Sequence, residues 1–238
     1  MASLYLDPAL DETAAATGRV RVTGEEARHA ITVARVRVGE RLAVGDGAGL
    51  IVEGAVASTD AGVLELDVEV IRREERPVPE LWLAQALAKG DRDELAIQVA
   101  TELGVTGVIP WQAERSISRW EGAKVRKGVD RWRSIVREAS KQSIRAWVPE
   151  VAEPATTGQL AALPGLVLVL EPTASLALST MPLDDQERIT LVVGPEGGVS
   201  PRELEQLTTH VRLGAEVLRT SSAGPAALAV LNARLGRW

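Results

Sequence analysis

Between residues 191 and 203 the chain reads Leu191-Val192-Val193-Gly194-Pro195-Glu196-Gly197-Gly198-Val199-Ser200-Pro201-Arg202-Glu203, an apolar run, a glycine-rich loop and a helix start. Ser200 suits the N-cap, Pro201 the first helical position and Glu203 the third, which completes a capping box. Glycines let a ligand approach the main chain closely, and ligands of open α/β sheets bind outside the carboxyl ends of the strands. The stretch predicts a strand end followed by either a ligand-binding loop or only a tight, well-capped turn.

A second loop precedes the last helix. It reads Val211-Arg212-Leu213-Gly214-Ala215-Glu216-Val217-Leu218-Arg219-Thr220-Ser221-Ser222-Ala223-Gly224-Pro225. Short apolar segments flank Gly214, and small residues then lead into a helix that we expect over residues 225–234. Backbone groups and hydroxyls of this loop could clasp an uncharged ligand, and an ordinary loop before a helix is the alternative.

The chain around these loops alternates between strands and helices. Strands are expected over residues 81–87, 105–110, 166–170 and 189–193, and helices over residues 91–103 and 121–143. Leu95, Val99 and Leu103 recur at four-residue spacing in the first of these helices, and Gly104 stands where a helix stop belongs. Alternation with short apolar strands predicts a parallel α/β sheet.

The first 72 residues have a different pattern. Short strands are expected over residues 19–22, 41–44, 50–56 and 63–70, with one helix over residues 25–35. We therefore predict three regions: a small β-barrel over residues 1–72, a charged, proline-containing linker over residues 73–79, and the α/β domain over residues 80–238. The sequence Gly45-Asp46-Gly47-Ala48-Gly49 lies between strands with no following helix, so we interpret it as a hairpin turn rather than a nucleotide loop.

The composition excludes several classes of site. The chain of 238 residues has no Cys, so disulfides, thiolate metal sites and thiol nucleophiles are excluded. It has only two His, and His29 lacks the neighbours of a metal site, so we expect no metal and assign His29 to packing or RNA contact. The first ten residues do not resemble a signal peptide, and no apolar run is long enough for a membrane span. A cytoplasmic protein without membrane contact is expected.

Positive charge is concentrated in one window. The net charge is −6, yet residues 115–145 contain ten cations and three anions, a local balance of +7. Clustered cations bind phosphates by displacing counterions, and a solvated helix face is the alternative.

Several motifs together resemble a known family. They comprise Gly194-Pro195-Glu196-Gly197-Gly198, Leu213-Gly214, Leu218-Arg219-Thr220, Lys89-Gly90-Asp91-Arg92, Thr101-Glu102-Leu103-Gly104-Val105, Glu114-Arg115-Ser116, Glu138-Ala139, Gln142-Ser143, His29-Ala30, Val36-Arg37 and Gly45-Asp46-Gly47. In this order they resemble the RsmE-type family of SPOUT methyltransferases, the ribosomal RNA small subunit methyltransferases E, over nearly the whole chain. One departure is Ser221-Ser222-Ala223 where the family often has Glu-Thr-Ala, which places a catalytic role for an acid there in doubt.

The resemblance implies a trefoil-knotted parallel-sheet domain preceded by a PUA-like β-barrel that helps hold RNA. It also implies a homodimer, bound S-adenosylmethionine, and methylation of N3 of a uridine in the 16S ribosomal RNA of the small ribosomal subunit. The absence of Cys is compatible with this reaction, because methylation at pyrimidine C5 commonly needs a thiolate adduct. For the dimer interface we expect the last helix, through an apolar face of Ala227, Leu228, Leu231 and Leu235, with packing inside one subunit as the alternative.

The motifs and the charge pattern together give the candidate site residues. The expected cofactor-binding residues are Leu170, Glu171, Gly194, Pro195, Glu196, Gly197, Gly198, Leu213, Gly214, Leu218, Thr220 and Ala223. Arg219 and Glu196 are the candidate catalytic residues. The candidate RNA-binding residues are Arg19, Arg21, Arg28, Arg35, Lys89, Arg92, Arg115, Arg131, Arg137, Lys141 and Arg145, with Arg145 nearest the target.

Two other functions remain open. The first is another SPOUT reaction, such as ribose 2′-O-methylation of transfer RNA, which the order of the upstream motifs disfavours. The second is a non-catalytic RNA-binding or assembly module that has kept the fold. Binding of S-adenosylmethionine would argue against the second.

Overall fold

The computed structural model describes residues 4–183 and 185–238, which form two compact units. The first unit extends through Arg76 and also includes Ser140–Val148, and the second comprises Pro77–Ala139 and Pro149–Trp238. The structure thus differs from the sequence-based division, which placed residues 140–148 in the second domain. Within the described residues, no helix has the length and apolar character that crossing a membrane requires.

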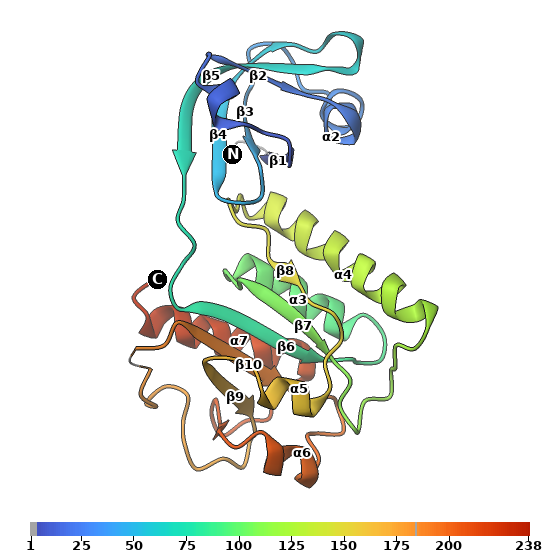
Figure 1. Cartoon of the computed structure of the whole chain (residues 1–238), viewed down its shortest axis with the longest axis vertical. Helices are drawn as coiled ribbons and strands as arrows, with labels where there is room; N and C mark the ends of the chain where they lie inside the picture. The colour runs from blue at the N-terminus through green and yellow to red at the C-terminus, as the bar shows by residue number, and fades with distance from the viewer. Residues whose placement is uncertain (1–3, 184) are drawn as a thin grey trace. The chain divides into compact units, whose positions relative to one another are not determined.

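One five-stranded sheet, in the order β1-β3-β4-β5-β2, builds the first unit (Figure 1). Its strands are β1 (Leu4–Leu6), β2 (Arg19–Val22), β3 (Arg41–Gly45), β4 (Leu50–Ser58) and β5 (Leu64–Arg73). The helical elements are α1 (Glu12–Ala15), α2 (Gly24–Arg28), the π-helix η1 (His29–Ala34) and the 3₁₀ turn η2 (Asp60–Gly62). The four predicted strands and the predicted helix are confirmed. Strand β1 was missed because three apolar residues are too short to show an alternating pattern.

The segment 140–148 joins the first unit through the turn between β3 and β4. The backbone N–H of Gly49 donates to Ala146 O at 3.0 Å, and that of Val148 donates to Gly47 O at 3.0 Å. Gly49 has φ +103°, and a Cβ there would lie 2.9 Å from the Trp147 ring. The predicted hairpin turn is confirmed, and its glycines also allow a distant segment to pack on it.

The second unit contains a six-stranded sheet in which every pair is parallel, in the order β11-β9-β10-β6-β7-β8. Its strands are β6 (Glu80–Ala86), β7 (Gly107–Trp111), β8 (Glu150–Val151), β9 (Leu166–Leu170), β10 (Arg188–Val193) and β11 (His210–Val211). The helices are α3 (Arg92–Glu102), α4 (Ala123–Gln142), α5 (Thr157–Ala161), α6 (Pro201–Gln206) and α7 (Thr220–Arg234). The predicted parallel α/β sheet is confirmed.

Helices cover both faces of this sheet, which explains why its strands are continuously apolar. On one face, Trp82 and Ala84 of β6 belong to the same buried cluster as Leu160 of α5. On the other face, Leu83 lies so close to Gly224 of α7 that a Cβ on this glycine would come within 2.9 Å of it. Alternate residues of one strand thus serve opposite layers.

The helix predicted over residues 91–103 is confirmed as α3, but the residues whose spacing indicated it do not form its buried face. Leu95 is 49% exposed, and Val99 and Leu103 are only half-buried. The buried residues are Asp93, Ala96, Ile97, Ala100 and Thr101. Small side chains form the buried face because α3 packs against α7 and β6, where they permit close approach.

The last helix begins at Thr220 rather than at Pro225, so the small-residue segment before Pro225 is helical and not a loop. Pro225 lies inside the helix and is buried. Ala227, Leu228 and Leu231 are fully buried within the second unit, so the face that we expected at a dimer interface belongs to the subunit's own core. The expected face was wrong, and the alternative of internal packing is correct for these residues.

Candidate cofactor pocket and nucleic-acid surface

A pocket of about 460 Å³ lies at the carboxyl ends of the central strands of the second unit. Its walls come from the end of β9, the glycine-rich loop after β10, and the loop between β11 and α7. The lining residues are Arg92, Leu170, Glu171, Pro172, Val193, Gly194, Pro195, Glu196, Gly198, Val199, Val211, Arg212, Leu213, Gly214, Glu216, Val217, Leu218, Arg219, Thr220 and Ala223. The two loops singled out in the sequence therefore meet around one cavity.

Of the expected cofactor-binding residues, all but Gly197 line this pocket. A Cβ on Gly197 would lie 3.3 Å from the Cβ of Arg115, so this position is crowded by Arg115. Both candidate catalytic residues, Arg219 and Glu196, also line the pocket. The sequence reasoning missed Pro172, Val193, Val199, Val211, Arg212, Glu216 and Val217, all of which directly flank or lie between residues that it named.

The capping box at the start of α6 is present. Ser200 Oγ accepts from Glu203 N at 3.3 Å, and the N–H of Ser200 donates to Glu203 Oε2 at 3.0 Å. The other carboxylate oxygen of Glu203 accepts from Glu114 N at 2.8 Å and from Thr157 Oγ1 at 3.0 Å. Glu203 is 4% exposed, so a residue predicted only as a local cap also ties the loop after β7 and the start of α5 to α6.

The glycine-rich loop has little free space around its main chain. A Cβ on Gly194 would lie 2.8 Å from Val199 Cγ2, and Gly198 has φ +73°. Arg115 Nη1 donates to the carbonyl of Gly197 at 3.1 Å and so ties the loop to the segment after β7. A side chain at Gly194 would collide with Val199, and a side chain at Gly198 would be strained by the positive φ.

Glu196 holds Arg92 at the pocket. Arg92 Nη1 donates to Glu196 Oε1 at 2.6 Å, with side chains 50% and 29% exposed. Burial works to raise the pKa of Glu196. The hydrogen bonds from its own backbone N–H, from Arg92 and from the backbone of Lys89 outweigh burial and leave the pKa below its ordinary value. The carboxylate is therefore ionised at neutral pH, and its lowered basicity suits the orientation of Arg92 better than proton abstraction.

The loop between β11 and α7 is exposed in its middle and anchored at both ends. Residues 214–219 are exposed, including Val217 at 77% and Leu218 at 40%. At one end Arg212 Nη1 donates to Ala174 O at 2.7 Å and to Ser175 O. At the other end Thr220 is buried. This loop forms an exposed wall of the pocket that is anchored at both ends.

The candidate RNA-binding residues of the second unit separate into two groups. Lys89, Arg92 and Arg115 meet around the glycine-rich loop, through the contacts of Glu196 and Gly197. Arg131 of α4 instead pairs with Glu94 at 2.7 Å, and Arg137 is half-buried. The first group contacts the glycine-rich loop, and Arg92 of this group lines the pocket, whereas the second group is engaged with other parts of the protein.

Lys141 and Arg145 lie in the first unit and are largely buried. Lys141 is 8% exposed and its Nζ lies 3.3 Å from Glu26 Oε2. Burial lowers the pKa of the Arg145 guanidinium to about 10, with the Glu74 carboxylate acting in the opposite direction. Lys141 is thus a structural partner of Glu26, which the charge pattern alone could not show.

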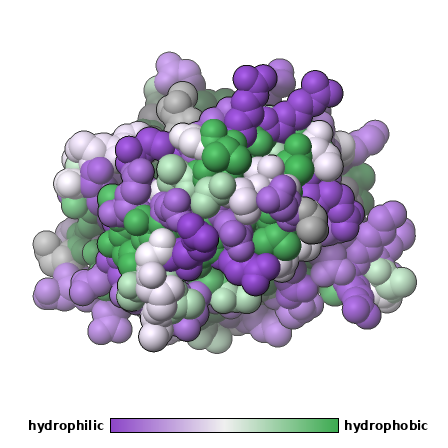
Figure 2. Space-filling view, turned by 90° about the horizontal axis from the view of Figure 1, so that it is seen from above, coloured by the Kyte–Doolittle hydropathy of each residue, from purple (hydrophilic) through white to green (hydrophobic). Residues whose placement is uncertain are grey.

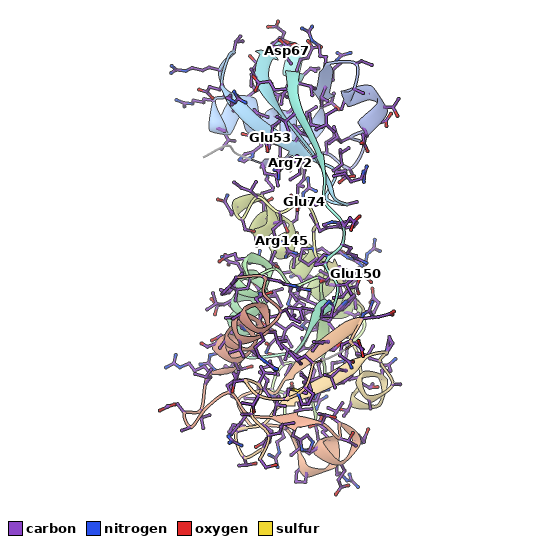
Figure 3. The ribbon with its side chains drawn as sticks, turned by 90° about the vertical axis from the view of Figure 1, so that its left-hand side faces the viewer. Glu53, Asp67, Arg72, Glu74, Arg145 and Glu150 are labelled. Atoms are coloured by element: carbon purple, nitrogen blue, oxygen red, sulfur yellow. The ribbon has the colours of Figure 1, made fainter. Side chains whose placement is uncertain are left out.

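The remaining arginines of the first unit differ in their pairing. Arg19 pairs with Asp67 at 2.8 Å and Arg21 with Glu65 at 3.1 Å, so both are neutralised across the sheet. Arg72 likewise lies between Glu53 and Glu74 (Figure 3). Arg28 and Arg35 are exposed, and neither has an ion-pair partner among residues 4–183 and 185–238; Arg35 ends η1 with φ 55°.

Two family models match the chain. The RNA methyltransferase domain matches residues 74–232, and the RNA methyltransferase PUA domain matches residues 22–69. Ribosomal RNA small subunit methyltransferase E of Mycobacterium bovis is 41% identical, covering 93% of this chain and 89% of that protein. The chain belongs to the ribosomal RNA small subunit methyltransferase E family. The Bacillus subtilis member is 31% identical over 89% of this chain and 88% of its own length.

Solved structures agree with this membership. The family member from Neisseria gonorrhoeae, bound to S-adenosyl methionine, superposes with a TM-score of 0.85 at 27% identity over 98% of both chains. A putative methyltransferase from Legionella pneumophila in complex with the same cofactor gives a TM-score of 0.86 at 27% identity, also over 98% of both chains. The fold of the family thus extends over the whole chain, including the first unit.

Proposed function

We propose that this chain transfers a methyl group from S-adenosylmethionine to N3 of a uridine in the 16S ribosomal RNA of the small ribosomal subunit. The observation that carries the proposal is the pocket formed by the two family motifs at the carboxyl ends of the parallel strands. Membership of the family and the cofactor-bound solved relatives support it.

The pocket suits this cofactor in size and lining. Its volume of about 460 Å³ lies within the range of roughly 300–1,000 Å³ usual for small-molecule sites. The glycine-rich loop and residues 213–218 offer main-chain groups and small or apolar side chains for an adenosine, and Glu171 and Glu216 add negative charge beside a cationic ligand. When bound, the cofactor supplies an electrophilic methyl group on its sulfonium.

The protein's own part in the reaction is to position the uracil and to stabilise its anion. Uridine N3 carries a proton near neutral pH, so negative charge develops on the uracil oxygens as this proton leaves. Arg92 and Arg219 line the pocket and would stabilise that charge through their guanidinium N–H groups. Glu196 keeps Arg92 in place.

We assign the RNA surface to the cations that protein carboxylates do not neutralise. In the second unit they include Lys89 and Arg115 beside the glycine-rich loop, next to Arg92, which is paired with Glu196. In the first unit they include Arg28 and Arg35. The face seen in Figure 2 carries hydrophilic side chains interspersed with hydrophobic patches.

The proposal includes a knotted second unit, a homodimer and a cytoplasmic location. The chain leaves the edge strand β11 and then returns to the middle of the sheet, where the last helix packs against β6 and β10. This return of the C-terminal segment to the centre of the sheet supports the knot. The exposed Leu95 and half-buried Val99 give α3 an apolar stripe for a second copy.

Mass spectrometry of 16S ribosomal RNA tests the reaction directly. A strain that lacks this chain should lose one N3-methyluridine from its 16S ribosomal RNA. The wild-type gene should restore this modification, whereas a gene for the Arg92→Leu variant should not restore it. Methylation found instead on transfer RNA would favour ribose 2′-O chemistry. Cofactor binding with no methylated RNA in any fraction would favour a non-catalytic module.

A further inference from the structure

Three chain segments meet at the base of the pocket through one buried hydroxyl. Thr220 Oγ1 accepts from Gln85 Nε2 at 2.9 Å and donates to the carbonyl of Gly194 at 2.8 Å. Gln85 is the penultimate residue of β6, Gly194 directly follows β10, and Thr220 is the first residue of α7. Thr220 is 7% exposed and Gln85 is fully buried, so both hydrogen bonds are shielded from water.

Only part of the hydrogen-bonding capacity of the Gln85 side chain is satisfied. Its Nε2 also donates to Ala86 O at 3.2 Å, but its Oε1 is buried with no hydrogen-bond partner among the described residues. A buried carbonyl without a partner destabilises a fold, and an apolar side chain of similar shape would avoid that penalty. Stability alone therefore does not account for a glutamine at this position.

The two hydrogen bonds of the Thr220 hydroxyl, to Gln85 and to Gly194, form a relay. This relay joins two walls of the pocket at their common base. Gly194 begins the glycine-rich loop, and Thr220 is the buried residue at which the exposed segment 214–219 returns to the core. Arg219 immediately precedes Thr220, and its carbonyl accepts from Ser222 N at 2.9 Å. Fixing Thr220 thus fixes the start of α7 and the candidate catalytic Arg219 relative to the glycine-rich loop.

We propose that Gln85 is a positioning residue that holds the two walls of the cofactor pocket in register through the hydroxyl of Thr220. This inference rests on the proposed function, because the ligand of the pocket is taken to be S-adenosylmethionine. Gln85 acts without touching the ligand, since it does not line the cavity. A relay of this kind reduces the ordering that the exposed loop would otherwise undergo on binding.

Calorimetric binding of S-adenosylmethionine to four variants tests the relay. Thr220→Val removes the hydroxyl and should weaken binding about tenfold, the effect of losing one buried hydrogen bond. Thr220→Ser keeps the hydroxyl and should bind within about twofold of wild type. Gln85→Met should weaken binding about as much as Thr220→Val, and the double variant should be no weaker than Thr220→Val alone.

Thr190→Val is the matched control. Thr190 is a fully buried threonine of β10 whose hydroxyl has no partner among the described residues, so its loss should leave binding unchanged. Gln85→Met should have a melting temperature no lower than that of Thr190→Val. Unchanged affinity in folded Thr220→Val, additive losses in the double variant, or equal losses in Thr190→Val would overturn the relay. A wild-type chain that fails to bind S-adenosylmethionine would overturn the proposed function itself.

Discussion

Two pairs of arginines in the first unit offer a matched test of where RNA binds. Arg28 and Arg35 are exposed without ion-pair partners in the described parts of the chain, whereas Arg19 and Arg21 are paired with Asp67 and Glu65. Changing either pair to Ala alters the net charge of −6 by the same amount. A difference between the two double variants therefore reports the local surface and not the total charge.

The expected magnitude follows from counterion release. Each phosphate contact adds about 0.7 to the slope of log affinity against log salt for single strands and about 0.9 for duplexes. Loss of Arg28 and Arg35 should flatten the slope by roughly 1.4–1.8 if each contacts one phosphate. Loss of Arg19 and Arg21 should change it little, because RNA would first have to displace the carboxylates of Asp67 and Glu65.

Fluorescence anisotropy provides the measurement. The probe is a labelled 16S ribosomal RNA fragment, titrated from about 50 to 200 mM potassium chloride, the range in which such slopes are steep. Cofactor affinity should stay constant in both double variants, because all four arginines lie outside the pocket lining. An equal decrease of the salt-dependence slope in both double variants would refute the assignment of Arg28 and Arg35 to the RNA surface. Equal slopes for wild type and both variants would exclude the first unit from the RNA surface.

Three further outcomes are expected. Glu203→Ala should lower the free energy of unfolding in urea by about 3 kcal/mol, because it leaves several buried donors without an acceptor; a loss below about 1 kcal/mol would contradict this. The pKa of Glu196 is lowered, so its pair with Arg92 is fully present above the ordinary value of 4.5 and is lost as the pH falls through the lowered pKa. Titration of Glu196 should accordingly leave cofactor affinity unchanged from pH 8 to pH 5. If wild type loses affinity in that range and Glu196→Gln does not, then Glu196 titrates at a higher pH than expected. Leu95→Asp should convert a dimer to a monomer in sedimentation velocity, and a dimer that persists would exclude the α3 stripe from the interface.

The sequence predicted those local structures that depend on contacts between residues close together in the chain. The capping box of Ser200 and Glu203 defines the start of α6, since its partners are three residues apart. The hairpin around Gly47 was likewise predictable. For helix α7 the local signal misled, because Pro225 favours a first position. Close packing of Gly224 on Leu83 and the anchoring of Thr220 start the helix five residues earlier.

The sequence gives the number of charged residues in each segment, but it does not show which cations are paired with acids in the folded protein. The window 115–145 carries +7, and this count does not distinguish Arg115 at the glycine-rich loop from Lys141 buried against Glu26. The acids that neutralise Arg19 and Lys141 lie 48 and 115 residues away, so only folding reveals which cations are free. The same holds for the stripe of Leu95, whose four-residue spacing indicates an apolar face but not its partner.

By itself the sequence determined the alternation of strands and helices, the glycine-rich loop with its capped helix, and the order of motifs that identifies the family. Tertiary structure alone decided how these parts are held. Gln85 and Thr220 are 135 residues apart, and their hydrogen bond exists only because the carboxyl ends of β6 and β10 meet beside the start of α7. Periodicity and capping depend on contacts within a few residues, whereas the base of the pocket depends on which strands become neighbours in the sheet.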